Sequence, residues 1–258
     1  VRSFFHSTFT LVKDSSDPEM IRLIMRSILP ALPLLEAVKV PLPLLLRRVL
    51  HFWCYSADVS LSTSTKSTSK VGFVSDTSSR LEAFLVLRRL TLCLDHTSHI
   101  KEAVMRGVYQ HYVRVCKNVN AYNISTITFL SNCVTELYGI DGPLSYQLTF
   151  LYLRQLASQL RTYLLRPSSK GLRSIYNWQF INCVRLWGQV LSTYALESNS
   201  ALRPLLYPFT QIATSILTLS SAPAYAPVKI VICECLTDVM FKCQVFIPIS
   251  AKGHSFGL

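Results

Sequence analysis

Apolar residues between Tyr176 and Leu191 recur at the spacing of an α-helix, and no other stretch constrains the fold as strongly. The main stripe consists of Tyr176, Phe180, Cys183, Val184, Trp187, Val190 and Leu191. A second apolar face consists of Trp178, Ile181 and Leu186, and a polar ridge beside the stripe consists of Asn182, Arg185 and Gln189. A helix with two apolar faces needs neighbours on two sides. The stretch therefore predicts the middle of a layered stack of helices.

The rest of the chain predicts an all-α protein. Glycine occurs only 8 times, and the long segments rich in Leu, Ile and Val have helical spacing, not strand alternation. Start and stop signals predict helices at roughly 18–29, 41–53, 76–94, 100–119, 124–138, 144–165, 173–195, 205–219 and 228–246, after a helix remnant in residues 1–12. Helices of this length joined by short turns form antiparallel pairs of about 40 residues. That period favours an α-solenoid of the HEAT or armadillo kind.

Composition divides the expected solenoid into parts. Residues 1–57 are the N-terminal helices, and residues 77–249 are the main helical-repeat region. Residues 58–76 are rich in Ser and Thr and have little to bury, so they predict a flexible insertion, either a phosphorylated regulatory loop or an insertion without function. Residues 250–258 are an irregular C-terminal tail. We expect the chain to be a fragment, because both ends interrupt predicted helical structure.

Charge and cysteine content limit the class of protein. The formal net charge of +12 suits a protein that works near nucleic acid or an acidic partner, although solvated helix faces also explain it. The 8 cysteines are spread over the predicted helices and indicate buried, reduced thiols in an intracellular protein. Residues 205–228 carry no charge, but their prolines and hydroxyl side chains favour a buried helix over a membrane span.

Motifs of known chemistry do not occur in this sequence. It has no Gly-x-Ser-x-Gly elbow and none of the glycine-rich loops that hold phosphates or dinucleotides. His96 and His99 better fit a helix cap than a zinc site, since structural zinc takes four well-spaced ligands. Glu234 and Asp238 fit a solvated helix face better than an acid and base pair. We therefore expect no catalytic, cofactor-binding or metal-binding residues.

Three arginines lie near aromatic residues in the sequence. Arg154 follows Tyr152, Arg185 precedes Trp187, and Arg203 precedes Tyr207. One interpretation is structural: each arginine stacks on a ring or binds the end of a helix. The other is a docking groove for a partner helix or for RNA, because Arg and aromatic residues dominate binding hot spots. The sequence leaves both open.

A series of short motifs in one order resembles the nucleolar complex protein 2 family. They lie at residues 85–90, 112–120, 136–139, 145–147, 152–157, 176–180, 202–208 and 246–248. The last two read LRPLLYP and FIP. The resemblance is dense from about residue 80 to 249 and thinner before residue 58. It gives a set of candidate partner-binding or family-signature residues, which are Arg154, Tyr176, Trp178, Arg185, Trp187, Arg203 and Tyr207.

The resemblance implies a helical-repeat scaffold of the nucleus, nucleolus and nucleoplasm that binds and does not catalyse. Its implied role is in biogenesis of the large (60S) ribosomal subunit. The implied partners are other nucleolar complex proteins, as a heterodimer, and pre-60S particles during maturation and intranuclear transport, with contact to rRNA as a further implication. An alternative of another class is a karyopherin-like transport adaptor. A membrane-embedded helical protein and an enzyme are weaker alternatives.

Overall fold

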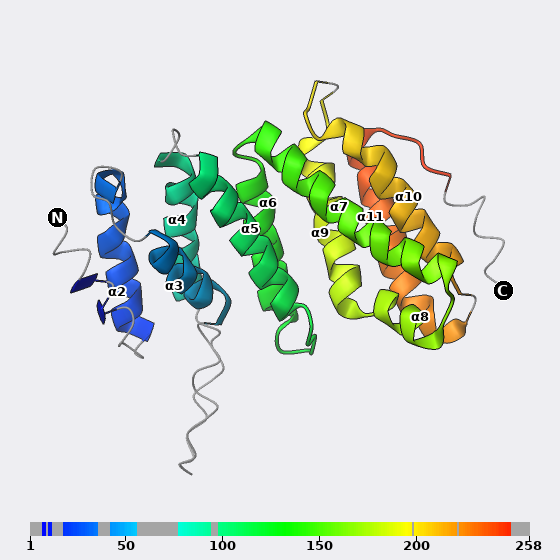
Figure 1. Cartoon of the computed structure of the whole chain (residues 1–258), viewed down its shortest axis with the longest axis horizontal. Helices are drawn as coiled ribbons and strands as arrows, with labels where there is room; N and C mark the ends of the chain where they lie inside the picture. The colour runs from blue at the N-terminus through cyan, green and yellow to red at the C-terminus, as the bar shows by residue number, and fades with distance from the viewer. Residues whose placement is uncertain are drawn as a thin grey trace, which may run out of the picture. The chain divides into compact units, whose positions relative to one another are not determined.

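In a computed structural model, the described residues are 7–8, 10–11, 18–35, 42–55, 77–93, 98–197, 199–220 and 222–248. All regular structure in these ranges is helical, which confirms the all-α prediction (Figure 1). The predicted insertion at 58–76 and the tail at 250–258 lie outside the described residues. The chain divides into an N-terminal unit, Val1–Tyr112 with Ser125–Leu137, and a C-terminal unit, Val113–Ile124 with Tyr138–Leu258.

The N-terminal unit is built from α2 (Pro18–Ile28), η1 (Leu29–Leu35), α3 (Leu42–Tyr55), α4 (Thr77–Cys93), α5 (Ser98–Val115) and α6 (Ile124–Tyr138). Helix α4 packs against α2, η1 and α3. The helix predicted at 18–29 ends within one residue of its predicted limit. Helix α2 stops at Ile28, and the segment with Pro30 and Pro33 continues as a 3₁₀ turn.

A buried arginine joins two helices of this unit. Arg80, near the start of α4, is only 4% exposed, and its Nη1 donates to the carbonyl oxygen of Cys54 at 2.7 Å and to that of Trp53 at 3.4 Å. These carbonyls lie in the last turn of α3, where no intrahelical donor remains for them. The arginine thus caps α3 and places a positive charge at the negative end of its dipole.

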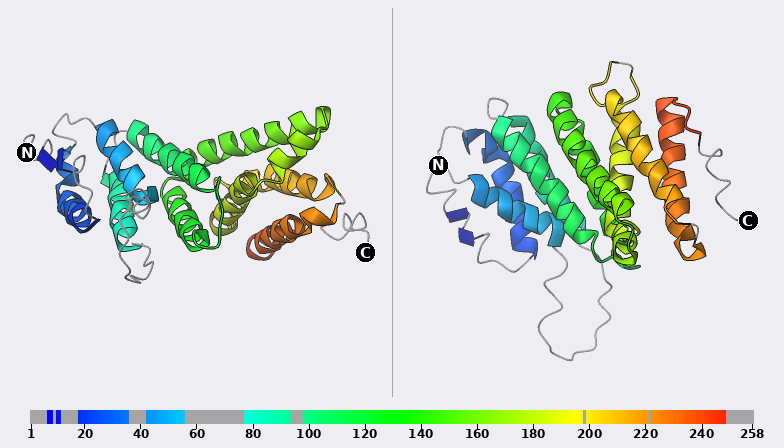
Figure 2. Two further views of the ribbon diagram at one scale, coloured as in Figure 1. Left: turned by 90° about the horizontal axis from the view of Figure 1, so that it is seen from below. Right: turned by 45° about the vertical axis from the view of Figure 1, so that its right-hand side comes forward.

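The C-terminal unit consists of α7 (Gly142–Leu165), α8 (Ser169–Ile175), α9 (Trp178–Tyr194), η3 (Arg203–Leu205), α10 (Leu206–Thr218), η4 (Pro223–Tyr225) and α11 (Ala226–Cys243). Helix α9 contacts α7, α10 and α11, and α9, α10 and α11 alternate in direction (Figures 1 and 2). Ile181 and Leu186 are fully buried on the second face of α9. The prediction that this helix is covered on two sides is therefore confirmed at these two residues, whereas Trp178, the third residue of that face, is 42% exposed.

Three details of the fold differ from the sequence predictions. The stretch 173–195 is not one helix, because α8 ends at Ile175 and the Asn177 side chain accepts a hydrogen bond from the Gln179 N–H to begin α9. Helix α5 ends at Val115 and not at residue 119. The third difference is Asn182, which the sequence pattern predicts on a polar ridge but which is only 4% exposed.

A glycine allows the closest packing in the C-terminal unit. Gly188 of α9 is fully inside the unit, and a methyl group added there would overlap Cys235 Sγ of α11 and lie 3.0 Å from Phe209 Cζ of α10. Three helices therefore meet at a position that has no room for a side chain. Gly188 interrupts the apolar stripe of α9, and only glycine is small enough for α10 and α11 to approach α9 this closely.

None of the helices in the described ranges has the combination of length and apolar content that a bilayer span requires. Seven cysteines can be described, all as free thiols. Cys54, Cys116, Cys133, Cys183, Cys235 and Cys243 are buried, and Cys233 is partly exposed.

Candidate partner-binding surface

Two of the candidate residues lie in the core of the C-terminal unit. Trp187 is fully buried, stacked on Tyr152 with ring centroids 5.7 Å apart and edge-on to Tyr138 at 5.3 Å. Tyr176 is 8% exposed, stacks on Tyr225 at 4.3 Å and donates from its hydroxyl to the carbonyl of Ile216 at 2.8 Å. Burial raises the pKa of Tyr176 to about 12. These aromatic rings organise the unit and offer little surface to a partner.

Arg203 closes the end of α9. Its Nη1 donates to the Leu196 carbonyl at 2.8 Å and to the Ala195 carbonyl at 3.3 Å, just past the last turn of that helix. This is the structural interpretation of the arginine, a guanidinium bound to a helix end. The same residue also lines a surface groove, so the two interpretations that the sequence left open do not exclude each other.

The groove brings together two motifs that are far apart in the sequence. It has a volume of about 460 Å³ and is lined by Arg203, Pro204, Leu206, Tyr207, Thr210, Gln211, Thr214, Val245, Phe246, Ile247 and Pro248. These residues come from η3, α10 and the segment that follows α11. Both the LRPLLYP motif at 202–208 and the FIP motif at 246–248 contribute to it.

The two most prominent side chains of the groove are aromatic. Tyr207 is 73% exposed and Phe246 is 83% exposed, whereas Ile247, the next residue after Phe246, is only 5% exposed and anchors the segment that follows α11. Exposed aromatic rings that share a groove with polar side chains such as Gln211 are typical of docking surfaces. Tyr207 is among the candidates that the sequence predicts, whereas Phe246 is not, although the FIP motif that contains it is the available signal.

A left-handed residue turns the chain back toward this groove. Gln244 follows the last helical residue of α11 with φ 51° and ψ 44°, and the Val245 N–H donates to the Met240 carbonyl at 3.3 Å. This is the usual way to end a helix and reverse the chain, although glycine is the usual residue at this position. Phe246 therefore owes its place in the groove to the backbone geometry at Gln244.

The remaining candidates are exposed and do not line the groove. Trp178, at the start of α9, is 42% exposed, and Arg154 and Arg185 are exposed on α7 and α9. Their sequence neighbours Tyr152 and Trp187 are buried. Residues two apart on a helix do not share a face, so these arginines point away from the rings that suggested stacking.

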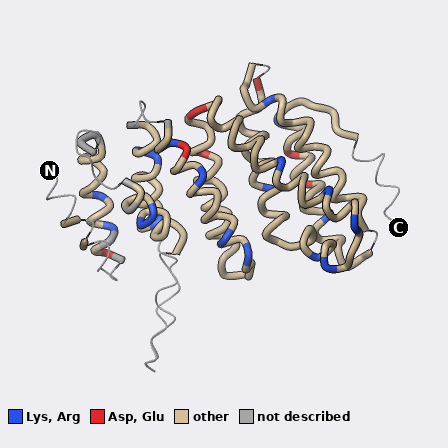
Figure 3. The backbone as a smooth tube through the Cα atoms, viewed as in Figure 1, with Lys and Arg blue, Asp and Glu red and all other residues tan. Residues whose placement is uncertain are grey.

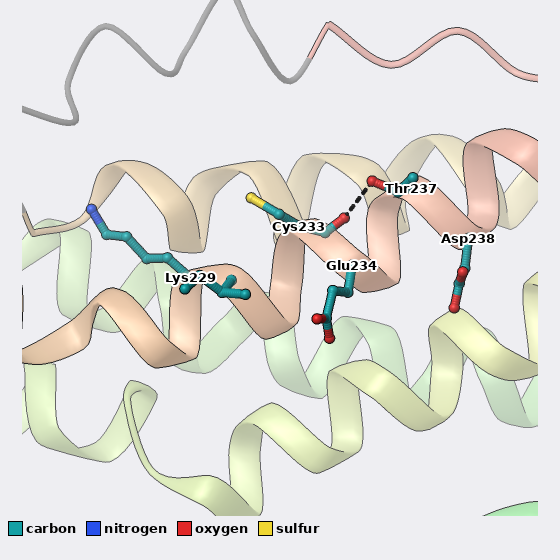
Figure 4. Close-up of a pocket in the computed structure, with 6 residues that line it drawn as sticks. Lys229, Cys233, Glu234, Thr237 and Asp238 are labelled. Carbon is teal, nitrogen blue, oxygen red and sulfur yellow. Dashed lines mark hydrogen bonds between the residues drawn. The ribbon is translucent and has the colours of Figure 1, made fainter. Parts of the chain in front are cut away.

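A second hollow lies along α11 and measures about 510 Å³ (Figure 4). All its lining residues, Lys229, Ile230, Cys233, Glu234, Thr237 and Asp238, belong to this one helix. Figure 4 shows the carboxylates of Glu234 and Asp238 on one side of the helix and the Lys229 amine reaching in another direction. The hollow is a depression on a helix face without converging groups. Within the described ranges, moreover, no three His, Cys, Asp or Glu side chains are close enough to hold a metal ion.

Comparison with known proteins gives a family match over most of this region. The model of the Noc2p family matches residues 99–252, a range that contains the groove and all seven candidate residues. Among curated proteins, the chain is 30% identical to nucleolar complex-associated protein 2 of Arabidopsis thaliana over 97% of its length. It is 32% identical to nucleolar complex protein 2 of Drosophila melanogaster over 67% of its length. It is also 26% identical over 97% of its length to an uncharacterised NOC2 family protein of Schizosaccharomyces pombe.

The chain spans a third or less of these relatives. The aligned region covers 30% of the Arabidopsis protein, 22% of the Drosophila protein and 33% of the Schizosaccharomyces protein. The similarity therefore concerns one region of much longer proteins.

Proposed function

The chain belongs to the Noc2p family, and we propose that it is a scaffold region of a nucleolar protein that assists biogenesis of the large ribosomal subunit. The observation that carries the proposal is the family match over 99–252, since this range holds the groove in which two family motifs converge. The names of the Arabidopsis and Drosophila relatives place those proteins in nucleolar complexes. We extend that setting to this chain, with action in the nucleolus and nucleoplasm on pre-60S particles.

The proposed architecture is an α-solenoid of HEAT-like helix pairs. The alternating directions of α9, α10 and α11 support it, as does the burial of α9 between neighbours. Stacked helix pairs present long side surfaces for binding partners and need no enclosed pocket. On this view residues 58–76 are an insertion between helices of the stack, and the protein acts by binding.

The proposed partner at the groove is another nucleolar complex protein, as part of a heterodimer. Tyr207 and Phe246 supply apolar area at small entropic cost, and Thr210, Gln211 and Thr214 supply hydrogen-bonding groups next to them. A partner helix or strand with apolar side chains fits a groove of this composition.

Affinity capture from nuclear extract tests the proposal. Tagged protein that contains this chain should retain other nucleolar complex proteins, and sequencing of the bound RNA should find precursors of large-subunit rRNA. The groove variant Tyr207→Ala with Phe246→Ala should retain the protein partners at least about tenfold less well, since exposed aromatic anchors dominate binding energy.

A matched control removes one tyrosine and one phenylalanine elsewhere. Tyr122 and Phe241 are 81% and 86% exposed and do not line the groove, so Tyr122→Ala with Phe241→Ala should leave capture unchanged. Equal loss in both variants would remove the groove from the proposal. Capture of nucleoporins or a small GTPase without precursor rRNA would support a karyopherin-like adaptor and contradict the proposed function.

A further inference from the structure

Basic residues without acidic neighbours in the sequence lie along α7 and α8. Residues 142–196 contain six Lys or Arg residues and no Asp or Glu. Five of the six positions lie on α7, on α8 or in the turn between them, where Figure 3 shows blue segments, and the sixth, Arg185, lies on α9. Arg154, Arg161, Arg166, Lys170 and Arg173 are all exposed. We call these five residues the α7–α8 basic face.

The two helices hold these charges in a defined arrangement. Arg154 and Arg161 are seven residues apart on α7, so they lie on the same side about 10 Å apart along the helix axis. That side is opposite to the buried residues of α7, which include Tyr152, Leu156 and Leu160. Both arginines therefore point directly to solvent.

A tight turn fixes α8 next to the end of α7. The Ser168 hydroxyl accepts from the Gly171 N–H at 3.0 Å, and a methyl group added at Gly171 would lie 3.0 Å from Tyr163 Cδ2 of α7. Arg166 directly follows the last residue of α7, and Lys170 and Arg173 lie three residues apart on α8, which puts them on one side of that helix. The basic face thus continues from α7 across the turn.

Ion pairs occur elsewhere in the described part of the chain. The arginines Arg22, Arg88 and Arg106 bind Glu19, Glu136 and Glu102, and all of these residues belong to the N-terminal unit. None of these pairs involves the α7–α8 basic face. Protein surfaces usually mix the two signs of charge, and a surface patch of one sign attracts ligands of the opposite charge.

We propose that the α7–α8 basic face binds the phosphate backbone of RNA. This inference deepens the proposed function, which places the protein on ribosomal precursors, and it assigns the RNA contact to a surface separate from the residues of the groove. Four of the five residues are arginines, whose guanidinium groups match phosphate oxygens in a bidentate way. Backbone contacts carry no sequence information, so binding should tolerate any RNA sequence.

The experiment measures affinity of the purified chain for a fluorescent RNA hairpin of arbitrary sequence over a range of salt concentrations. The test variant is Arg161→Gln, Arg166→Gln, Arg173→Gln. The control variant is Arg22→Gln, Arg88→Gln, Arg106→Gln, which makes the same chemical change at arginines with carboxylate partners. Circular dichroism checks that both variants keep the helical content of the parent.

The expected result separates the two variants. Loss of three phosphate contacts should lower the steepness of log affinity against log salt by about 2 to 3 units and weaken binding at least tenfold at about 0.1 M salt. The control variant should keep the salt dependence of the parent within about 1 unit, because it retains all contacts of the face. An equal effect of both variants would overturn the proposal, since net charge alone would then explain binding.

Two further outcomes have defined meanings. If the test variant binds RNA as well as the parent but loses binding to a poly-glutamate peptide, the face takes an acidic protein and the RNA proposal is wrong. Failure of the proposed function is recognised separately, by capture from RNase-treated nuclear extract. The parent would then retain no nucleolar complex protein, whatever its affinity for the hairpin.

Discussion

Buried thiol and phenol groups make individual residues of this protein sensitive to alkali. Burial raises the pKa of Cys133 from 9.0 to about 12, and hydrogen bonding with Trp53 offsets part of that increase. Burial likewise raises the pKa of Cys235 to about 12, with the positive charge of Arg185 acting in the opposite direction. In both cases the folded protein holds the proton more tightly than the unfolded chain.

This difference predicts how stability changes with pH. The stabilisation is fully present below pH 9, and it is lost as pH rises from 9 toward 12, because the unfolded thiols ionise first. The free energy of unfolding, measured in urea at pH 8, 9, 10 and 11, should fall across the upper three values. Cys133→Ala should make the decline shallower while it lowers stability at pH 8, and an identical decline in the variant would contradict this account.

Gly188 is a second residue on which the stability of the protein should depend. Gly188→Ala should destabilise the protein by about 1 to 3 kcal/mol, because the new methyl group must displace Cys235 and Phe209 in a closely packed crossing. Urea denaturation measures the change.

The control is Gly142→Ala at the start of α7, where an added methyl would meet only Ala201 Cβ, at an ordinary 3.7 Å. It should be neutral or stabilise by up to about 1 kcal/mol. A Gly188→Ala protein as stable as the parent would show that α9 and α11 can move apart at no cost.

Helices in this protein are joined by arginines that bind the carbonyl ends of their neighbours. Arg80 of α4 caps α3 in the N-terminal unit, and Arg203 of η3 caps α9 in the C-terminal unit. Each guanidinium fixes the element that carries it to the end of an earlier helix. This gives adjacent elements a defined register that apolar packing alone would not specify.

The prediction at this scale is that Arg80→Met lowers the free energy of unfolding by about 2 to 3 kcal/mol, because buried carbonyls at the end of α3 lose a charged donor. Arg88→Met is the control. Its ion pair with Glu136 is about half exposed, so its loss should cost less than about 1 kcal/mol. Similar losses from both substitutions would mean that Arg80 contributes only surface electrostatics.

The helices themselves were largely predictable from the sequence. Residues 124–138 have the same limits in prediction and structure, and the predicted end of α7 at Leu165 is confirmed, because apolar periodicity and Gly, Pro and Asp signals are local. The early end of α5 depends on a turn in which Asn120 and Asn123 each accept from the other's backbone N–H. Such reciprocal capping competes with the helix, and the apolar pattern does not report it.

The groove could not be assembled from the sequence. Tyr207 and Phe246 line the same groove because the chain reverses after α11 at Gln244, and a glutamine in the sequence does not predict a left-handed conformation. The sequence predicts Arg203 as a candidate, but only tertiary packing places it both at the end of α9 and in the lining of the groove. The sequence therefore indicated which residues matter and left their arrangement undetermined.

At the scale of the whole molecule, the sequence predicts that residues 58–76 are an exposed insertion between helices. Limited digestion of the folded chain with trypsin should cut first after Lys66 or Lys70, since the sequence there has little apolar material with which to pack. Fragment masses from mass spectrometry identify the first cut. Initial cleavage after Arg161 or Arg185, within regular helices, would show that the segment is protected and would contradict an insertion between helices.

The placement of the tryptophans has a practical consequence for following the two units. Trp53 in the N-terminal unit and Trp187 in the C-terminal unit are fully buried, whereas Trp178 is partly exposed to solvent. Indole emission moves to longer wavelength when the ring becomes hydrated. One variant that keeps only Trp53 and another that keeps only Trp187 would therefore show, by the wavelength of their emission, which unit unfolds first on heating. The same variants would show whether bound RNA raises the unfolding temperature of one unit and not of the other.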